Sequence, residues 1–319
     1  MNTATTLQTR ILPFSDENIA EAARLIAKGM VVAIPTETVY GLAGDAQNGE
    51  AVARIYEAKG RPGFNPLIVH VPDLAHAERL AVFDDRARAL ANAFWPGALT
   101  MVLPVRGDSG LSSLVTAGLD TVAIRVPAHR AMRALLTAAD RPLAAPSANA
   151  SGRISPTRAD HVALSLTGRI PLIIDDNATG LGLESTIISF GPDDIHLLRP
   201  GPITAQALTA ASHLPVTERR HDEAITAPGQ LLSHYAPSKP VRLNVTSPAP
   251  DEYLIGFGAV AGDASLSVDG DLTQAAANLF DLLHRADAAP KPRIAIAPIT
   301  DEGLGLAIND RLRRAAHQE

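Results

Sequence analysis

The sequence predicts an α/β protein with a large mixed-sheet domain, a long linker and a small Rossmann-like domain. Helical and strand-like patterns are interspersed without strict alternation up to about residue 212, which favours a mixed sheet. Residues 213–240 show no clear periodicity and contain four prolines, as expected for an ordered linker. From residue 241 the pattern reads strand, strand, helix, strand, helix, which is typical of a small parallel sheet. We therefore expect domains at 1–212 and 241–319.

The elements of the first domain follow from caps, apolar spacing and chain breakers. Ser15 is a plausible N-cap for a helix that ends at Gly29, and the helix expected at 49–59 ends at Gly60, a residue suited to the left-handed C′ position. The segment 74–93 is expected to be mostly helical, and a further helix is expected at 129–139. Strands are expected at 30–34, 67–71, 99–104, 121–126, 171–174, 186–190 and 195–199. Residues 35–42 are expected to form a loop or an irregular strand, and 146–152 and 175–183 are expected to be loops.

The second domain is expected to hold strands at 241–245, 253–257 and 293–297. A helix between the last two strands has an apolar face made by Leu272, Ala276, Leu279, Phe280 and Leu283. Residues 303–316 form a second, mostly helical segment.

Composition limits the functions that the chain can have. Its 319 residues are 46% hydrophobic, enough to bury a core, and no apolar run has the length of a membrane span. The N-terminus lacks an apolar signal core, so we expect a soluble, cytoplasmic protein without membrane contact. The absence of cysteine excludes disulfides, thiolate metal sites and a cysteine nucleophile. A net charge of −6 gives no overall preference for nucleic acid.

The stretch from Lys59 to His70 is the centre of the functional prediction. Lys59 and Arg61 are two cations separated by one glycine, and a loop rich in proline and glycine leads from them past Asn65 into a strand. A guanidinium fork beside a compact ammonium suits a polyphosphate. Taken alone, the same residues are also ordinary for the end of a helix, because a lysine there favours the dipole.

Several other polar loops follow predicted strands, where ligands often bind in α/β sheets. They contain Thr36, Thr38 and Tyr40, Ser147 and Asn149, Glu184 and Ser185, and Arg199. Thr121 and Arg125 flank an apolar strand, and His234 and Tyr235 lie in the linker. Each signal is weak alone, and there is no Walker A motif, GxGxxG, GxSxG or HExxH. The number of such loops in one domain is what indicates a site.

In this order the segments resemble the YrdC/Sua5 family in its two-domain form, and the resemblance covers nearly the whole chain. The matching motifs are PTETVYGL (35–42), KGRPGFNPLIVHV (59–71), FWPGALT (94–100), TVAIRVP (121–127), APSANASG (145–152), ESTI (184–187), LRPGPI (198–203), PGQLLSHYAP (228–237) and GLGLAINDRLRRAA (303–316). The resemblance implies a YrdC-like mixed, twisted sheet in the first domain and a linker that crosses the active site.

The resemblance also implies a reaction. L-threonine, bicarbonate or CO2, and ATP would give threonylcarbamoyl-AMP and pyrophosphate by adenylyl transfer. Partner proteins would then pass the threonylcarbamoyl group to an adenosine of tRNA. ATP would be a substrate, Mg2+ would be held mainly by its phosphates, and no metal-binding residues are expected.

The same resemblance assigns residues to the two substrates. Those implied for ATP are Lys59, Arg61, Asn65, Thr121, Ser147, Ser155, Arg199 and Tyr235. Those implied for threonine are Thr38, His70, Arg125, Ala145 through its backbone, and Ser185. Lys59, Arg61, Ser147 and Asn149 are the candidate catalytic residues. No residue is expected to be an obligatory general base, because the amine only has to lose a proton before it meets CO2.

Two alternatives remain open from the sequence. The first is a double-stranded RNA or ribosome binding module, which would need basic residues beyond a nucleotide site; the pI of about 5.9 argues against it. The second is a carbamoyltransferase that matures hydrogenases, whose central region looks similar. That family carries cysteine-rich zinc elements, and this chain has no cysteine.

Overall fold

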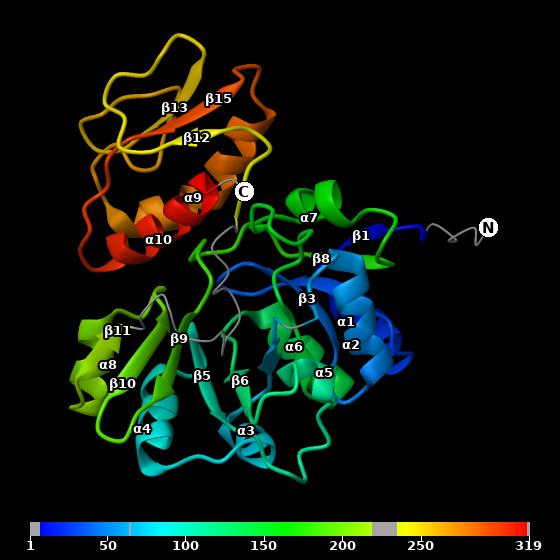
Figure 1. The fold of residues 1–319 in the computed structure, drawn as a ribbon. Coiled ribbons are helices and arrows are strands. Elements are labelled where there is room, and N and C mark those ends of the chain that lie inside the picture. Colours follow the sequence, from blue (N-terminus) through cyan, green and yellow to red (C-terminus); the bar gives the residue numbers. More distant parts are fainter. Residues whose placement is uncertain (1–6, 64, 219–234, 318–319) are drawn as a thin grey trace.

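The computed structural model describes residues 7–63, 65–218 and 235–317. Within them the chain forms two domains, each built on one sheet (Figure 1). The large sheet has the strand order β1-β8-β2-β3-β7-β4-β6-β5-β9-β10-β11, and the small one has the order β12-β15-β13-β14. Parallel and antiparallel pairs both occur in the large sheet, which confirms the predicted mixed α/β fold.

The described elements have these bounds. The strands are β1 Arg10–Pro13, β2 Val32–Pro35, β3 Tyr40–Asp45, β4 Ile68–His70, β5 Leu99–Pro104, β6 Thr121–Arg125, β7 Leu143–Ala144, β8 Leu172–Asp175, β9 Thr186–Phe190, β10 Ile195–Arg199, β11 Val216–Glu218, β12 Val241–Arg242, β13 Glu252–Gly256, β14 Ala264–Ser265 and β15 Arg293–Ile296. The helices are α1 Asp16–Ala27, α2 Gly49–Lys59, α3 Leu74–Leu80, α4 Asp85–Phe94, α5 Ser113–Thr116, α6 Arg130–Ala139, α7 Ala159–Leu166, α8 Ala205–Ser212, α9 Leu272–Ala288 and α10 Leu304–Ala316.

The two best-marked helices begin and end where the sequence predicts. The Ser15 side chain accepts a hydrogen bond from the backbone of Asn18 at the start of α1. Asn48 caps α2 in the same way, and α2 ends at Gly60, whose φ of 60° lies in the left-handed region. The cap therefore fixes where Lys59 and Arg61 leave the helix.

Alternating side chains divide the large sheet into two faces. On one face α1 and α6 cover the strands β2, β3 and β8, and on the opposite face α2, α3, α4 and α7 cover the rest of the core. In β4 the middle residue Val69 points into this second core, while Ile68 and His70 point to the first face. On the first face, Ile68 belongs to a small apolar cluster. The part of this face around β4 can therefore carry polar side chains.

Some expectations were wrong in detail. The helix expected at 74–93 is broken into α3 and α4, because Ala81 forms a bridge to Val105 and Asp84 caps a new helix. Residues 35–42, expected as a loop or an irregular strand, end in a regular strand, β3, which pairs with β2 as a hairpin. The helices α7 and α8 and the strand β1 were not predicted. The strand β11 lies inside the expected linker 213–240 and extends the large sheet.

The small domain packs directly on the large one. In Figure 1 its helices α9 and α10 lie between the small sheet and the first domain. The core of the small domain continues into the first domain through Val39, Ile154 and Leu183, and into the linker through Tyr235. A side chain at Gly182 would collide with the backbone of Ala276 in α9, so the helix and the loop are in close contact.

No helix among the described residues is long and apolar enough to span a membrane.

Candidate active site

A small cavity lies on the face of the large sheet that carries His70. Its volume is about 50 Å³, counted as the space that the centre of a water molecule can occupy. It is lined by Thr36, Thr38, Val39, Gly41, Arg61, Ile68, His70, Arg125, Ala145, Pro146, Ser147, Glu184, Ser185, Arg199 and Tyr235. The structure thus gathers residues from both predicted substrate sites around one space.

The predicted site residues fall into two groups. Those that line the cavity are Arg61, Ser147, Arg199 and Tyr235 from the ATP set, and Thr38, His70, Arg125, Ala145 and Ser185 from the threonine set. Those that do not line it are Lys59, Asn65, Thr121, Asn149 and Ser155.

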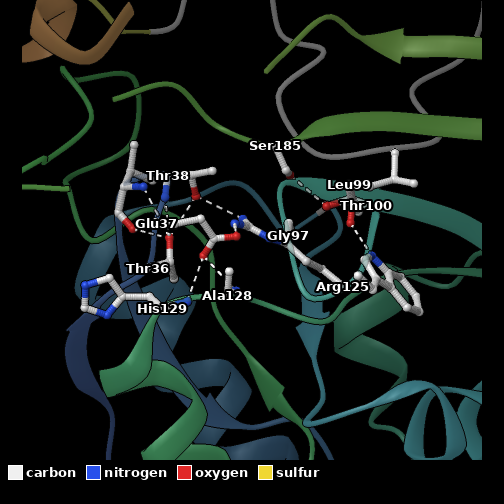
Figure 2. Close-up of polar contacts among 12 residues, drawn as sticks. Thr36, Glu37, Thr38, Gly97, Leu99, Thr100, Arg125, Ala128, His129 and Ser185 are labelled. Atoms are coloured by element: carbon white, nitrogen blue, oxygen red, sulfur yellow. Dashed lines mark hydrogen bonds and ion pairs between the residues drawn. The ribbon is translucent and has the colours of Figure 1, made fainter. Parts of the chain in front are cut away.

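Arg125 stands at one end of the cavity and is held on three sides. Its Nε donates to the carbonyl of Gly97, one terminal nitrogen donates to the Thr38 hydroxyl at 3.0 Å, and the other donates to Glu37 at 2.6 Å (Figure 2). Together these bonds fix the plane of the guanidinium. Each terminal nitrogen keeps one N–H group that these three bonds do not use. A fork held in this way can bind a carboxylate.

Glu37 holds Arg125 in place and was missed as a site residue. Its second carboxylate oxygen accepts from the backbone N–H groups of Ala128 and His129, just before α6 (Figure 2). Burial raises the pKa of the Glu37 carboxyl, but the charge and hydrogen bond of Arg125 outweigh this effect and leave the pKa below its ordinary value. Glu37 is therefore a charged partner for Arg125.

Ser185 and Arg199 form a second fixed group at the cavity. Arg199 donates from Nε and from a terminal nitrogen to the carbonyl of Ser185, and also to its hydroxyl. The Ser185 hydroxyl also lies 2.7 Å from that of Thr100 (Figure 2). The strands β5, β9 and β10 bring these residues together, although 85 residues separate Ser185 from Thr100.

Lys59 is buried beside the cavity and holds a loop. Its Nζ donates to the carbonyls of Ser147 and Asn149, at 2.6 and 2.5 Å. Asn149 in turn donates from its amide to the carbonyls of Ala150 and Arg153. Burial, and then the charge of Arg61, lower the pKa of Lys59 well below its ordinary value. Both residues therefore shape the loop that carries Ser147, without lining the cavity themselves.

Arg61 links the cavity to the loop that follows α2. It donates to the carbonyls of Asn65 and Pro66, and burial is the main cause that lowers its pKa to about 10. The amide of Asn65 is buried, and neither its nitrogen nor its oxygen has a partner among the described residues. A buried amide without partners is costly, so Asn65 is poised to bind a polar group.

His70 is a buried histidine of the cavity wall. It is 2% exposed, and its Nδ1 has no hydrogen-bond partner among the described residues. Burial, and then the charge of Arg125, lower its pKa to about 3. His70 is therefore a neutral imidazole at physiological pH, and it can exchange one hydrogen bond with a small ligand.

Tyr235 closes the cavity from the side of the small domain. It is completely buried, its ring centroid lies 5.4 Å from that of Phe280, and the guanidinium of Arg311 lies over the ring. It therefore contacts the cavity and the helices α9 and α10 at once. The neighbouring His234 lies outside the described residues.

Thr121 lies at the start of β6, while Arg125 lies at its end. The two residues are four positions apart, which corresponds to about 13 Å along the strand, and their side chains lie on the same face of the sheet. The two side chains therefore do not meet within the cavity.

Arg311 was also missed as a site residue, and Glu184 was noted in a polar loop but not assigned to either substrate. Glu184 lines the cavity, and Arg311 of α10 pairs with it at 2.9 Å. A signal for Arg311 existed in the sequence: Ile308, Leu312 and Ala315 form the buried face of this helix, and Arg311 falls on the same face at helical spacing. A charge at such a position needs a buried partner.

The arrangement suits a small zwitterion next to a polyphosphate. Arg61 and Arg199 supply positive charge to the wall, and Arg125, Thr38 and His70 supply a fork, a hydroxyl and an imidazole. Among the described residues no group of three or more acidic or histidine side chains is placed to hold a metal ion.

Two family models match the chain. The one described as "Telomere recombination", for Sua5, YciO and YrdC, matches residues 24–201, and the one described as "Threonylcarbamoyl-AMP synthase, C-terminal domain" matches residues 203–317.

Individual relatives extend over most of the chain. The threonylcarbamoyl-AMP synthase of Bacillus subtilis is 42% identical, with 96% of this chain and 94% of that protein covered. The enzyme of the same name from Schizosaccharomyces pombe is 35% identical, with 89% and 84% covered. The crystal structure of Pyrococcus abyssi Sua5 complexed with L-threonine is 37% identical, covers 97% of both chains and superposes with a TM-score of 0.86.

Proposed function

The chain belongs to the Sua5/YciO/YrdC family, and from this premise we propose that it is a threonylcarbamoyl-AMP synthase. L-threonine, bicarbonate or CO2, and ATP give threonylcarbamoyl-AMP and pyrophosphate. In the proposed arrangement residues 1–212 catalyse the reaction, residues 213–240 cross the site, and residues 241–319 form the C-terminal domain. The product serves the threonylcarbamoyladenosine modification of tRNA, through separate transfer proteins.

The observation that carries the proposal is that one cavity joins an end suited to an amino acid with an end suited to phosphate. Arg125 binds the threonine carboxylate with the N–H groups left over from its bonds to Gly97, Thr38 and Glu37. The backbone of Ala145 and the hydroxyl of Ser185 line the same space and complete the threonine site.

The nucleotide occupies the other end. Arg61 and Arg199 contact the phosphates, Ser147 and Asn65 bind them or the ribose, and Lys59 and Asn149 hold the Ser147 loop in place. Ser155 and Thr121 complete the proposed nucleotide set. Mg2+ held mainly by the phosphates would add positive charge where pyrophosphate leaves.

The chemistry requires positioning and the exclusion of water more than a base. The threonine ammonium loses a proton, and the free amine adds to CO2 and releases a second proton to solvent, which gives a carbamate. A carbamate oxygen then forms a bond to the α-phosphorus while the bond to pyrophosphate breaks. The carbamate is labile in water, so a closed site protects it. Tyr235 lines the cavity, and in the proposed mechanism it moves to admit ATP and closes again over it.

The test is direct. The purified protein is incubated with ATP, threonine and bicarbonate, and pyrophosphate and the adenylate are followed by mass spectrometry. Both products should appear together, and both should require threonine. Pyrophosphate without a threonine-dependent adenylate would refute the proposal.

A further inference from the structure

The C-terminal domain contacts the active site through one buried arginine. Arg311 in α10 is completely buried. Its Nε donates to a carboxylate oxygen of Glu184 at 2.9 Å, and a terminal nitrogen donates to the backbone carbonyl of Glu184 at 3.4 Å. The other terminal nitrogen donates to the carbonyl of Pro200 and to the carboxylate of Asp310, both at 2.8 Å. Three of these four bonds cross the domain boundary.

Glu184 is a carboxylate in the wall of a cavity that is otherwise cationic. Its second oxygen accepts a hydrogen bond of 2.5 Å from the Ser155 hydroxyl. Burial alone would raise the pKa of Glu184, but the charges of Arg311 and then Arg199 hold it below its ordinary value. The side chain is therefore ionised, and it faces the space proposed for a polyanion.

An unpaired carboxylate there would oppose nucleotide binding. Like charges at close range in a buried site repel strongly, because little solvent screens them. Arg311 lies on the side of Glu184 away from the cavity and neutralises its charge. Glu184 can therefore hold the Ser155 hydroxyl without adding a net negative charge to the cavity wall. The same guanidinium lies 5.5 Å from the ring centroid of Tyr235, so the contact also fixes the residue that closes the cavity.

We propose that Arg311 is a positioning residue of the adenylate-forming site, which neutralises Glu184 and holds it against Ser155 so that ATP can bind. The inference rests on the proposed function. It makes the C-terminal domain part of the active site, in addition to carrying the end of the linker. The competing explanation is that Arg311 only attaches the two domains to each other.

The test compares net charges at residues 184 and 311. Arg311→Gln leaves the pair with a net charge of −1 and should raise the KM for ATP by about tenfold, equivalent to about 1.4 kcal/mol. The KM for threonine should change much less. Glu184→Gln leaves a net charge of +1 and should not raise the KM for ATP. Arg313→Gln is the matched control, because Arg313 lies on the same helix, is 59% exposed and faces the exposed Asp301 at 3.9 Å.

The double variant distinguishes positioning from attachment. Glu184→Gln with Arg311→Gln restores a neutral pair, and a glutamine at 184 can still accept from Ser155. The KM for ATP should return close to the wild-type value. If Arg311 only attaches the domains, the double variant has lost both partners and its KM stays as high as that of Arg311→Gln, or rises further.

Failures of the two proposals are distinguishable. Wild-type protein that forms no adenylate refutes the proposed function, and the inference falls with it. Active wild-type protein with an unchanged KM for ATP in Arg311→Gln refutes the inference alone. If Arg311→Gln does not fold, as thermal unfolding would reveal, Glu184→Gln and the double variant decide the question. A double variant that folds but binds ATP far more weakly than wild type would overturn the inference.

Discussion

Replacing His70 with phenylalanine should reduce the preference for threonine over valine. Thr38, His70 and Ser185 are the candidate partners of the substrate hydroxyl. The Thr38 hydroxyl already lies near Thr36 and Arg125, and the Ser185 hydroxyl near Thr100 and Arg199. The Nδ1 of His70 has no partner in the described part of the chain, so it is the atom that a hydroxyl would satisfy.

The magnitude follows from the cost of an unpaired buried polar atom. Valine, which has the same shape as threonine but no hydroxyl, would leave Nδ1 unpaired at a cost of about 1–3 kcal/mol. This equals roughly 5- to 150-fold in kcat/KM. Phenylalanine removes the polar atom and with it this penalty, so that threonine and valine should react at more similar rates. Because the pKa of His70 is about 3, the wild-type preference should not vary between pH 6 and 9.

The assay measures pyrophosphate release with threonine and with valine as separate substrates. His76→Phe is the control, because His76 is an exposed histidine that bonds to Asp73. The ratio of the two kcat/KM values should fall for His70→Phe and not for the control. An unchanged ratio in a folded His70→Phe protein, or a wild-type ratio that falls steeply between pH 6 and 7, would refute the reasoning.

Three further predictions concern other parts of the molecule. Arg61→Ala should lower kcat/KM by roughly 30- to 1,000-fold, because a charge-assisted contact to the transferring phosphates is worth about 2–4 kcal/mol; wild-type turnover in a folded variant would contradict this. Tyr235→Ala should increase the ATP hydrolysed per adenylate released, because the carbamate is less protected; mass spectrometry of both products measures the ratio, which should not equal that of the wild type. His161 and His284 stack across the domain boundary, and burial lowers the pKa of each to about 4. In the unfolded state each histidine has a pKa near 6.5, so at pH 5 the unfolded protein binds more protons than the folded protein. The free energy of unfolding should therefore fall by about 2 kcal/mol per histidine between pH 7 and pH 5. Denaturant unfolding should show that this free energy depends less on pH when both residues are phenylalanine.

Local signals predicted the helices with clear caps and apolar spacing, such as α1 and α2, but not α7 and α8. Asn48 and Gly60 bound α2 because each satisfies backbone groups within a few residues of itself. The break between α3 and α4 was missed because it depends on a bridge between Ala81 and Val105, which are distant in sequence. The order of strands in the sheet depends on many such pairings, so local patterns indicated only that the sheet was mixed.

The site shows the same limit. Motif positions predicted which residues would gather, but not what holds them. Glu37 and Arg125 are 88 residues apart, and Glu184 and Arg311 are 127 residues apart. No local pattern identifies such partners, because an ion pair depends on the arrangement in space. Lys59 shows the converse: its place in a motif suggested a phosphate contact, and its Nζ is bonded to loop carbonyls.

The position of Tyr235 constrains how the site can open. Its ring packs against Phe280 of α9 and under Arg311 of α10, and the whole residue is buried. Moving Tyr235 away from the cavity by itself would expose this apolar contact and uncover the Glu184–Arg311 pair, which is costly for a buried ion pair. Moving α9 and α10 together with Tyr235 would keep the aromatic contact but separate Arg311 from Glu184. Only the movement of α9 and α10 leaves Glu184 without Arg311, so along this route ATP entry and charge compensation at the site are coupled through the C-terminal domain.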